Sequence, residues 1–179
     1  ERVDATAVLA QLRMRKSPQE LEHVERAVAI AEAAFREIQT AIVAGIRERE
    51  LAAALVQALH GAGSEPALPF IPIVATGPNG ADPHHFPGDR RLARGDLLII
   101  DWGASYHGYF SDITRTFVVA AEPTQEQLAA HLAVRDAARA ARAMAAPGIS
   151  AGEVDAAARD CLSRAGFGEF FVHRTGHGL

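Results

Sequence analysis

The stretch that decides the fold of this chain is residues 97–119, LLIIDWGASYHGYFSDITRTFVV. Two apolar runs rich in β-branched residues flank a short Ser-Tyr-His-Gly connection, which is the pattern of a β-hairpin. Each run carries one aspartate, Asp101 or Asp112. Burying an unpaired carboxylate is costly, so a carboxylate within an apolar strand usually has a partner or binds a metal.

The register of this hairpin relates the two aspartates to each other. If the turn centres between Tyr106 and His107, Asp101 and Asp112 stand directly opposite, with Cβ atoms about 4.5–5.5 Å apart on one face. Like charges at that distance repel unless a cation lies between them. Two divalent metals about 3.5–4 Å apart fit such a pair. A bulge in the connection would change this register, and two surface aspartates are the alternative.

Length and composition indicate one globular domain. The 179 residues suffice for a hydrophobic core, and a net charge of −4 with 22% charged residues gives no nucleic-acid signature. The sequence has no run of 18 apolar residues and no signal peptide, and its single cysteine, Cys161, can form no internal disulfide. We therefore expect a cytoplasmic protein that binds neither membranes nor nucleic acid.

Capping boxes, glycines and apolar periodicity delimit the expected elements. A box has Ser or Thr followed three residues later by Glu or Gln, and three occur, at 17–20, 124–127 and 150–153. Helices are predicted over 18–43, 48–60, 124–145 and 150–164. Strands are predicted over 70–76, where Pro72 favours an edge position, and over 170–173.

An internal repeat relates two parts of the chain at an offset of 103 residues. The run Gly45-Ile46-x-x-x-Glu50-Leu51 matches Gly148-Ile149-x-x-x-Glu153-Val154, and Gly63 falls on Gly166. Such a match predicts two copies of a unit of about 100 residues, and chance similarity between Ala-rich helices is the alternative. The second copy would continue to about residue 222, with images of the two aspartates near positions 204 and 215.

Four motifs then suggest a family. They are Gly77-Pro78-Asn79-Gly80 with His84, Leu92-x-x-Gly95-Asp96 running to Asp101-x-Gly103-Ala104, Tyr109-x-Ser111-Asp112-x-Thr114-Arg115-Thr116, and His173-x-x-Gly176-His177-Gly178-Leu179. In this order they resemble the pita-bread metallopeptidases, which include methionine aminopeptidases, Xaa-Pro aminopeptidases, Xaa-Pro dipeptidases and creatinases. The resemblance covers about residues 15–179 and looks closest to the proline-specific branch.

The resemblance implies an α+β class and the pita-bread (creatinase/aminopeptidase) fold. That fold has duplicated α-α-β units and a curved antiparallel sheet, and we expect it to be incomplete at the C-terminus of this chain. Residues 17–179 would be the N-terminal and middle part of the catalytic domain. Residues 1–16 would be a linker or the end of a missing N-terminal domain.

The resemblance also implies a metal site with five protein ligands, two Asp, one His and two Glu. Asp101, Asp112 and His177 match the first three, and both Glu would lie beyond Leu179. Together they would hold two divalent ions, and the oxygen-rich ligand set favours Mn²⁺ over Co²⁺ or Zn²⁺. The family's two outer histidines, which contact the substrate and the tetrahedral intermediate, match His84 and His173.

Two further residues complete the expected substrate-binding set. Phe70 would form a wall of the pocket for the first residue of the substrate, and Arg115 would anchor charge behind the site. Ordinary roles are the alternatives: Phe70 as plain core, Arg115 as a solvated strand residue, and His173 and His177 as a structural strand histidine and an exposed loop histidine. His85 is the alternative to His84 as the contacting histidine.

The expected function is that of a dinuclear-metal peptidase. It would hydrolyse the Xaa-Pro bond at the N-terminus of peptides or in Xaa-Pro dipeptides, and it would act as a homodimer. The 179 residues alone are expected to be inactive, because they lack two Glu ligands. The alternatives are a methionine aminopeptidase or creatinase-like hydrolase of the same fold, and a catalytically inactive pita-bread binding module.

Overall fold

The computed structural model describes residues 4–178, which form two compact units. The first ends at Ala121 and the second spans Glu122–Gly178, and each is described by itself. Residues 1–3 of the expected linker, and Leu179 of the last motif, lie outside the described residues. Within residues 4–178, no helix combines the length and the apolar character needed to span a membrane.

The first unit begins with two helices. α1 (Thr6–Met14) was not expected from the sequence, and none of its residues is buried. α2 (Pro18–Ile38) starts at the predicted capping box, in which Ser17 Oγ accepts a hydrogen bond from the Glu20 N–H and the Glu20 carboxylate accepts one from the Ser17 N–H. The helix ends at Ile38 rather than at residue 43, because the chain tightens into the 3₁₀ turn η1 (Gln39–Ala41).

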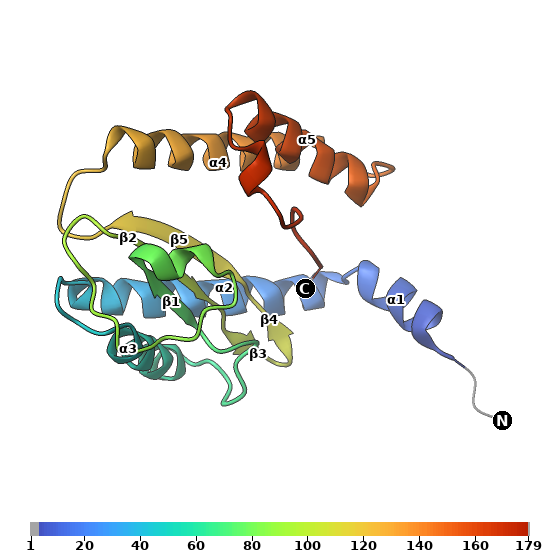
Figure 1. Ribbon diagram of the computed structural model, residues 1–179. Helices are drawn as coiled ribbons and strands as arrows, with labels where there is room; N and C mark the ends of the chain where they lie inside the picture. Colours follow the sequence, from blue (N-terminus) through green and yellow to red (C-terminus); the bar gives the residue numbers. More distant parts are fainter. Residues whose placement is uncertain (1–3, 179) are drawn as a thin grey trace. The chain divides into compact units, whose positions relative to one another are not determined.

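A three-stranded antiparallel sheet, in the order β1-β2-β5, packs against α2 and α3 (Glu48–Gly61) (Figure 1). Its strands are β1 (Ile73–Thr76), β2 (Leu97–Trp102) and β5 (Ile113–Val118). Alternate residues of β2 are buried. Among them, Trp102 donates its indole N–H to the Ala31 carbonyl at 2.9 Å and stacks on Phe35. α2 therefore covers the Trp102 face, and Asp101 points to the other face.

The connection between β2 and β5 is itself a small hairpin of β3 (Ser105–Tyr106) and β4 (Tyr109–Phe110). His107 and Gly108 form its two-residue turn with φ of 50° and 75°, which is the type I′ geometry that suits the twist of hairpin strands. The turn therefore centres one residue later than we assumed from the sequence. As a consequence Asp101 stands opposite Thr114, and the prediction that it faces Asp112 directly is wrong.

The second unit is built on α4 (Gln125–Met144) and α5 (Ala151–Arg164). Both begin at their predicted capping boxes, with the side-chain bonds of Thr124 and Ser150 in place. The predicted strand at 170–173 is wrong, because the chain there forms the 3₁₀ turn η3 (Gly168–Phe170) and an irregular segment. A strand needs a neighbour to pair with, and the described part of this unit contains none.

The helix at the centre of the predicted repeat recurs in the two units. α3 and α5 are related by the predicted offset of 103 residues at both ends. Each is followed by a glycine with positive φ, Gly63 at 103° and Gly166 at 82°. The closing hydrogen bonds also correspond, since Ser64 N–H donates to Leu59 O and Phe167 N–H to Leu162 O, both at 2.9 Å.

Candidate active site

The two aspartates lie on one face of the sheet in diagonal positions. Asp101 is half-buried near the end of β2, with its Oδ1 atom buried, and Asp112 is exposed immediately before β5. Because Asp101 pairs with Thr114, Asp112 is its diagonal neighbour, and such neighbours are about 7–8 Å apart on the same face. This spacing is wider than predicted and leaves room for cations between the carboxylates.

Gly103 and Ser111 fix the backbone between the two aspartates. A Cβ on Gly103 would overlap the carbonyl oxygen of Ser111 and lie 2.8 Å from Cγ of Pro69. Ser111 is fully buried, and its hydroxyl accepts a hydrogen bond from the Ala104 N–H at 3.0 Å and donates one to the Ala27 carbonyl at 3.1 Å. The residue that precedes Asp112 is thus held to both the hairpin and α2.

The predicted substrate-binding residues Phe70 and Arg115 occupy different surroundings. Arg115 pairs with Ile100 across the sheet, so it lies on the face opposite Asp101, where its guanidinium donates to the Thr114 carbonyl. This register favours a role behind the carboxylates over direct substrate contact. Phe70 lies in the loop before β1 and lines a cavity of about 360 Å³ together with apolar side chains that include Val56.

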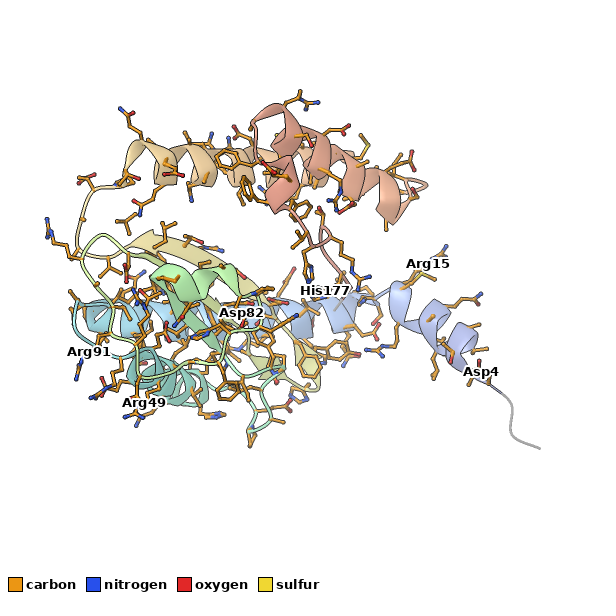
Figure 2. The ribbon with its side chains drawn as sticks, viewed as in Figure 1. Asp4, Arg15, Arg49, Asp82, Arg91 and His177 are labelled. Atoms are coloured by element: carbon orange, nitrogen blue, oxygen red, sulfur yellow. The ribbon has the colours of Figure 1, made fainter. Side chains whose placement is uncertain are left out.

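The loop that carries His84 covers the Asp101 side of the sheet. It opens with the 3₁₀ turn η2 (Gly77–Ala81), which contacts β1 and β2 (Figure 1). A Cβ on Gly80 would lie 3.2 Å from Cδ1 of Ile99, and Ile99 shares its face of β2 with Asp101. His84 is exposed, and its backbone N–H donates to the carboxylate of Asp82, which Figure 2 labels.

The neighbouring histidine, His85, is occupied by a structural contact. Its Nε2 atom lies 2.8 Å from Oε2 of Glu48, whose side chain is completely buried. Burial by itself raises the pKa of Glu48, but hydrogen bonds from His85, from Asn79 and from two backbone N–H groups together hold that pKa below its ordinary value. The contact gives His85 a structural role and favours His84 as the histidine that meets a substrate.

Glu48 is a residue that the sequence did not reveal. A glutamate in the first turn of a helix is common, because the helix dipole favours negative charge there. Its four hydrogen-bond partners are 28 to 40 residues away in the chain: Thr76 N–H (2.8 Å), Asn79 Nδ2 (2.9 Å), His85 Nε2 (2.8 Å) and Gly88 N–H (3.1 Å). Only folding brings these donors together.

In the second unit, α5 holds the segment that carries His173 and His177. Arg159 donates to the carbonyls of Phe171 at 2.9 Å and His173 at 2.8 Å, and it pairs with Asp155. The Asp155 carboxylate also accepts a hydrogen bond from the Thr175 N–H at 2.8 Å. Both histidines are exposed, and Figure 2 labels His177.

The sequence offered one signal for this arrangement, the i,i+4 spacing of Asp155 and Arg159. The backbone N–H of Thr175 and the Arg159 guanidinium lower the pKa of Asp155, although partial burial opposes them. The carboxylate therefore stays ionised and remains an acceptor for both partners.

The metal ligands predicted from the sequence divide between the two units. Asp101 and Asp112 belong to the first and His177 to the second. Within residues 4–178, no cluster of three or more His, Cys, Asp or Glu side chains is arranged to hold a metal ion. The structure does bring Asp101 and Asp112 to one face, and two carboxylates are suitable oxygen donors for a hard divalent cation.

Comparison with known proteins identifies the family. The sequence model of metallopeptidase family M24 matches residues 22–179. The chain belongs to metallopeptidase family M24. This assignment confirms the predicted resemblance, and the family implies a divalent metal cofactor. The carboxylate pair of Asp101 and Asp112 fits that requirement.

Individual M24 relatives support the same fold. Probable dipeptidase PepE of Mycobacterium tuberculosis is 42% identical over 176 residues, which are 98% of this chain and 46% of that protein. A solved prolidase from Pyrococcus furiosus has a TM-score of 0.88 and 38% identity, covering 93% of this chain and 49% of the other. For X-Pro aminopeptidase from Thermotoga maritima the TM-score is 0.87 and the identity 36%, covering 91% and 45%. The pita-bread fold is thus confirmed.

The matched relatives are longer than this chain. The chain spans about half the length of the curated relatives it matches. The fold and the membership of a peptidase family are the properties that these comparisons give to this chain.

Proposed function

We propose that the full-length protein is a dinuclear-metal peptidase that hydrolyses the bond between an N-terminal residue and proline. The observation that supports it best is the pair Asp101 and Asp112, diagonal on one sheet face in an M24 chain. Relatives named Xaa-Pro dipeptidase and X-Pro aminopeptidase support the proline specificity. The nitrogen of an Xaa-Pro bond carries no hydrogen, so peptidases that bind that N–H fail at it.

In this proposal Asp101, Asp112 and His177 provide three of the metal ligands. When bound, two divalent cations lower the pKa of a water molecule towards neutrality and polarise the scissile carbonyl. The Ser111 hydroxyl and the close approach at Gly103 hold the backbone beside Asp112 in place. The backbone that leads into Asp112 is therefore held in one position.

His84 and His173 are proposed to contact the substrate. An imidazole N–H aimed at the developing oxyanion of the tetrahedral intermediate contributes about 2.7–4 kcal/mol in comparable sites. Exposure of His84 on a loop over the Asp101 side of the sheet supports this role. Phe70 is proposed to wall the pocket for the first substrate residue, and Arg115 to anchor charge behind the site.

The test combines metal binding and hydrolysis in the full-length protein. Mn²⁺ binding is measured by titration calorimetry, and turnover is measured on an Xaa-Pro dipeptide and on a longer Xaa-Pro peptide. Asp101→Asn and Asp112→Asn should each abolish turnover and weaken metal binding at least about 10-fold. The matched control is Asp136→Asn on the exposed side of α4, which should change neither quantity.

Two outcomes would contradict the proposal, and a third measurement would choose between its two forms. If the wild-type protein binds no divalent metal and cleaves no peptide, it is the inactive binding module. If it cleaves N-terminal methionine instead of Xaa-Pro, the proline specificity is wrong. Preference for the dipeptide over the longer peptide would assign it as a dipeptidase, and the reverse as an aminopeptidase.

Three finer properties belong to the same proposal. Mn²⁺ is proposed over Co²⁺ and Zn²⁺ because four of the five expected ligands are carboxylates, and activity after exchange of each metal tests this. A homodimer is proposed from the resemblance to the proline-specific branch, and light scattering measures its mass. A cytoplasmic location is proposed because Cys161, the single cysteine, forms no internal disulfide, and cell fractionation tests it.

A further inference from the structure

A buried carboxylate in the first unit has no part in the metal site or in the substrate contacts proposed above. Glu48, the first residue of α3, is 0% exposed. Both of its oxygens accept hydrogen bonds, and all the donors belong to one segment, residues 76–88. One side chain of α3 thus organises a whole loop.

The positions of the donors determine which part of the loop is held. The Thr76 N–H lies where the loop leaves β1, and the Gly88 N–H lies at its far end. Between them, the side chains of Asn79 and His85 reach the same carboxylate. His84 is adjacent to His85 in the chain, so its backbone is fixed on both sides while its side chain stays exposed.

The loop held in this way covers the carboxylate face of the sheet. Gly80 approaches Ile99, whose side chain is on the same face of β2 as Asp101. Thr76 is tied a second time, since its hydroxyl donates to Asp96 at 3.1 Å. Glu48 therefore determines where the His84 loop lies relative to Asp101.

A charged residue is a costly way to fill a buried position. Apolar side chains of similar volume often give equal or greater stability than a buried ion pair. A carboxylate offers something different, because it accepts several strong, directional hydrogen bonds at once. The Glu48 carboxylate accepts hydrogen bonds from four donors within 3.1 Å. Such a set of bonds is suited to holding a loop in one conformation.

We infer that Glu48 is a positioning residue, which holds the 76–88 loop so that His84 meets the substrate on the Asp101 face. This inference rests on the proposed function, because it gives His84 a substrate to contact. Glu48 itself touches neither the substrate nor the metal. It acts through the loop, and its effect on the reaction passes through His84.

The experiment compares four forms of the metal-loaded, full-length protein with the wild type: Glu48→Gln, His84→Ala, the double variant, and Glu50→Gln. Glutamine keeps the shape of Glu48 but places an NH₂ group against two of its four donors, because each oxygen of Glu48 accepts two hydrogen bonds. Glu50 lies in the same turn of α3, is exposed and accepts hydrogen bonds from Arg47 rather than from the 76–88 loop, so Glu50→Gln is the matched control. The readouts are kcat and KM on an Xaa-Pro peptide, and hydrogen exchange of residues 76–88.

The expected results separate positioning from general stability. Glu48→Gln should lower kcat/KM about 10- to 100-fold, mainly through kcat, and should speed exchange of the loop about tenfold or more. Adding Glu48→Gln to His84→Ala should change kcat/KM less than about twofold, because both changes remove the same interaction. Glu50→Gln should resemble the wild type in both readouts.

Two results would overturn the inference. Unchanged loop exchange in Glu48→Gln would show that the carboxylate does not hold the loop. Fully additive losses in the double variant would show that Glu48 acts on stability and not through His84. Failure of the proposed function is recognised separately, by a wild-type protein that does not hydrolyse Xaa-Pro peptides when loaded with metal, and the role of His84 would then fall with it.

Discussion

Replacing Gly103 with alanine tests the geometry that places the two aspartates. The new Cβ would overlap the Ser111 carbonyl oxygen and lie 2.8 Å from Cγ of Pro69 and 3.1 Å from the Ser111 carbonyl carbon. Ordinary van der Waals contact begins near 3.4 Å. The backbone at Ser111 must therefore withdraw, and Ser111 is the residue whose hydroxyl joins Ala104 to α2.

The expected cost follows from these contacts. Overpacking a well-packed site costs about 1–3 kcal/mol, and weakening one or two neutral hydrogen bonds of Ser111 adds about 1 kcal/mol each. The Gly103→Ala variant should therefore lose about 2–5 kcal/mol of unfolding free energy. Since Asp112 follows Ser111 directly, the displaced backbone should also weaken Mn²⁺ binding by the full-length protein.

Urea denaturation followed by tryptophan fluorescence measures this loss. Trp102 is the single tryptophan and is 1% exposed, so its signal reports on the first unit. The matched control is Gly61→Ala in α3, where no atom lies within 4 Å of the added Cβ and where alanine should stabilise by about 0.4–1 kcal/mol. A Gly103→Ala variant within about 0.5 kcal/mol of the wild type would refute the predicted steric conflict.

Three further predictions concern the caps, the pH dependence and the second unit. Ser150→Ala should destabilise α5 by about 0.5–2 kcal/mol, measured by circular dichroism during thermal unfolding, whereas an unchanged midpoint would contradict the cap. The pKa of Glu48 is depressed below its ordinary value of 4.5, so the ionised carboxylate stabilises the fold above pH 4.5, and this stabilisation is lost as the pH falls through the folded pKa. Urea titrations between pH 6 and 3 should therefore show a smaller loss of unfolding free energy for Glu48→Gln than for the wild type. Parallel curves for the two proteins would contradict this contribution of Glu48. Arg159→Ala should speed hydrogen exchange over residues 171–175, since the carbonyls of that segment lose their donor, and equal exchange rates would show that the guanidinium does not hold it.

Local features were predictable wherever neighbouring residues decide the conformation. The capping boxes at Ser17, Thr124 and Ser150 formed as predicted, because a cap depends on residues three apart. The repeat was also visible in the sequence, because its two copies carry glycines at matching positions. In the structure these glycines have positive φ and follow similar helix ends. α1 was missed, because its apolar residues have no buried partner and give no clear stripe.

Features that depend on register or on distant partners were not predictable. The position of the hairpin turn differs by one residue from our assumption, and that moved Asp112 from the opposite to the diagonal position relative to Asp101. The left-handed backbone conformation of His107 places the turn at His107 and Gly108. The sequence is compatible with this turn and with the one we assumed. The strand predicted at 170–173 failed because strands depend on partners.

The sequence by itself determined the family, the starts of α2, α3, α4 and α5 and the repeat of α3 in α5, and it suggested the candidate ligands Asp101, Asp112 and His177. All of these depend on residue types at short spacing or on motifs in a fixed order. Only the tertiary structure decided that the two aspartates are diagonal and that Arg115 faces away from them. It alone showed that Glu48 is buried beneath the His84 loop, because a side chain and backbone N–H groups 28 and 40 residues away in the chain meet only when the chain is folded.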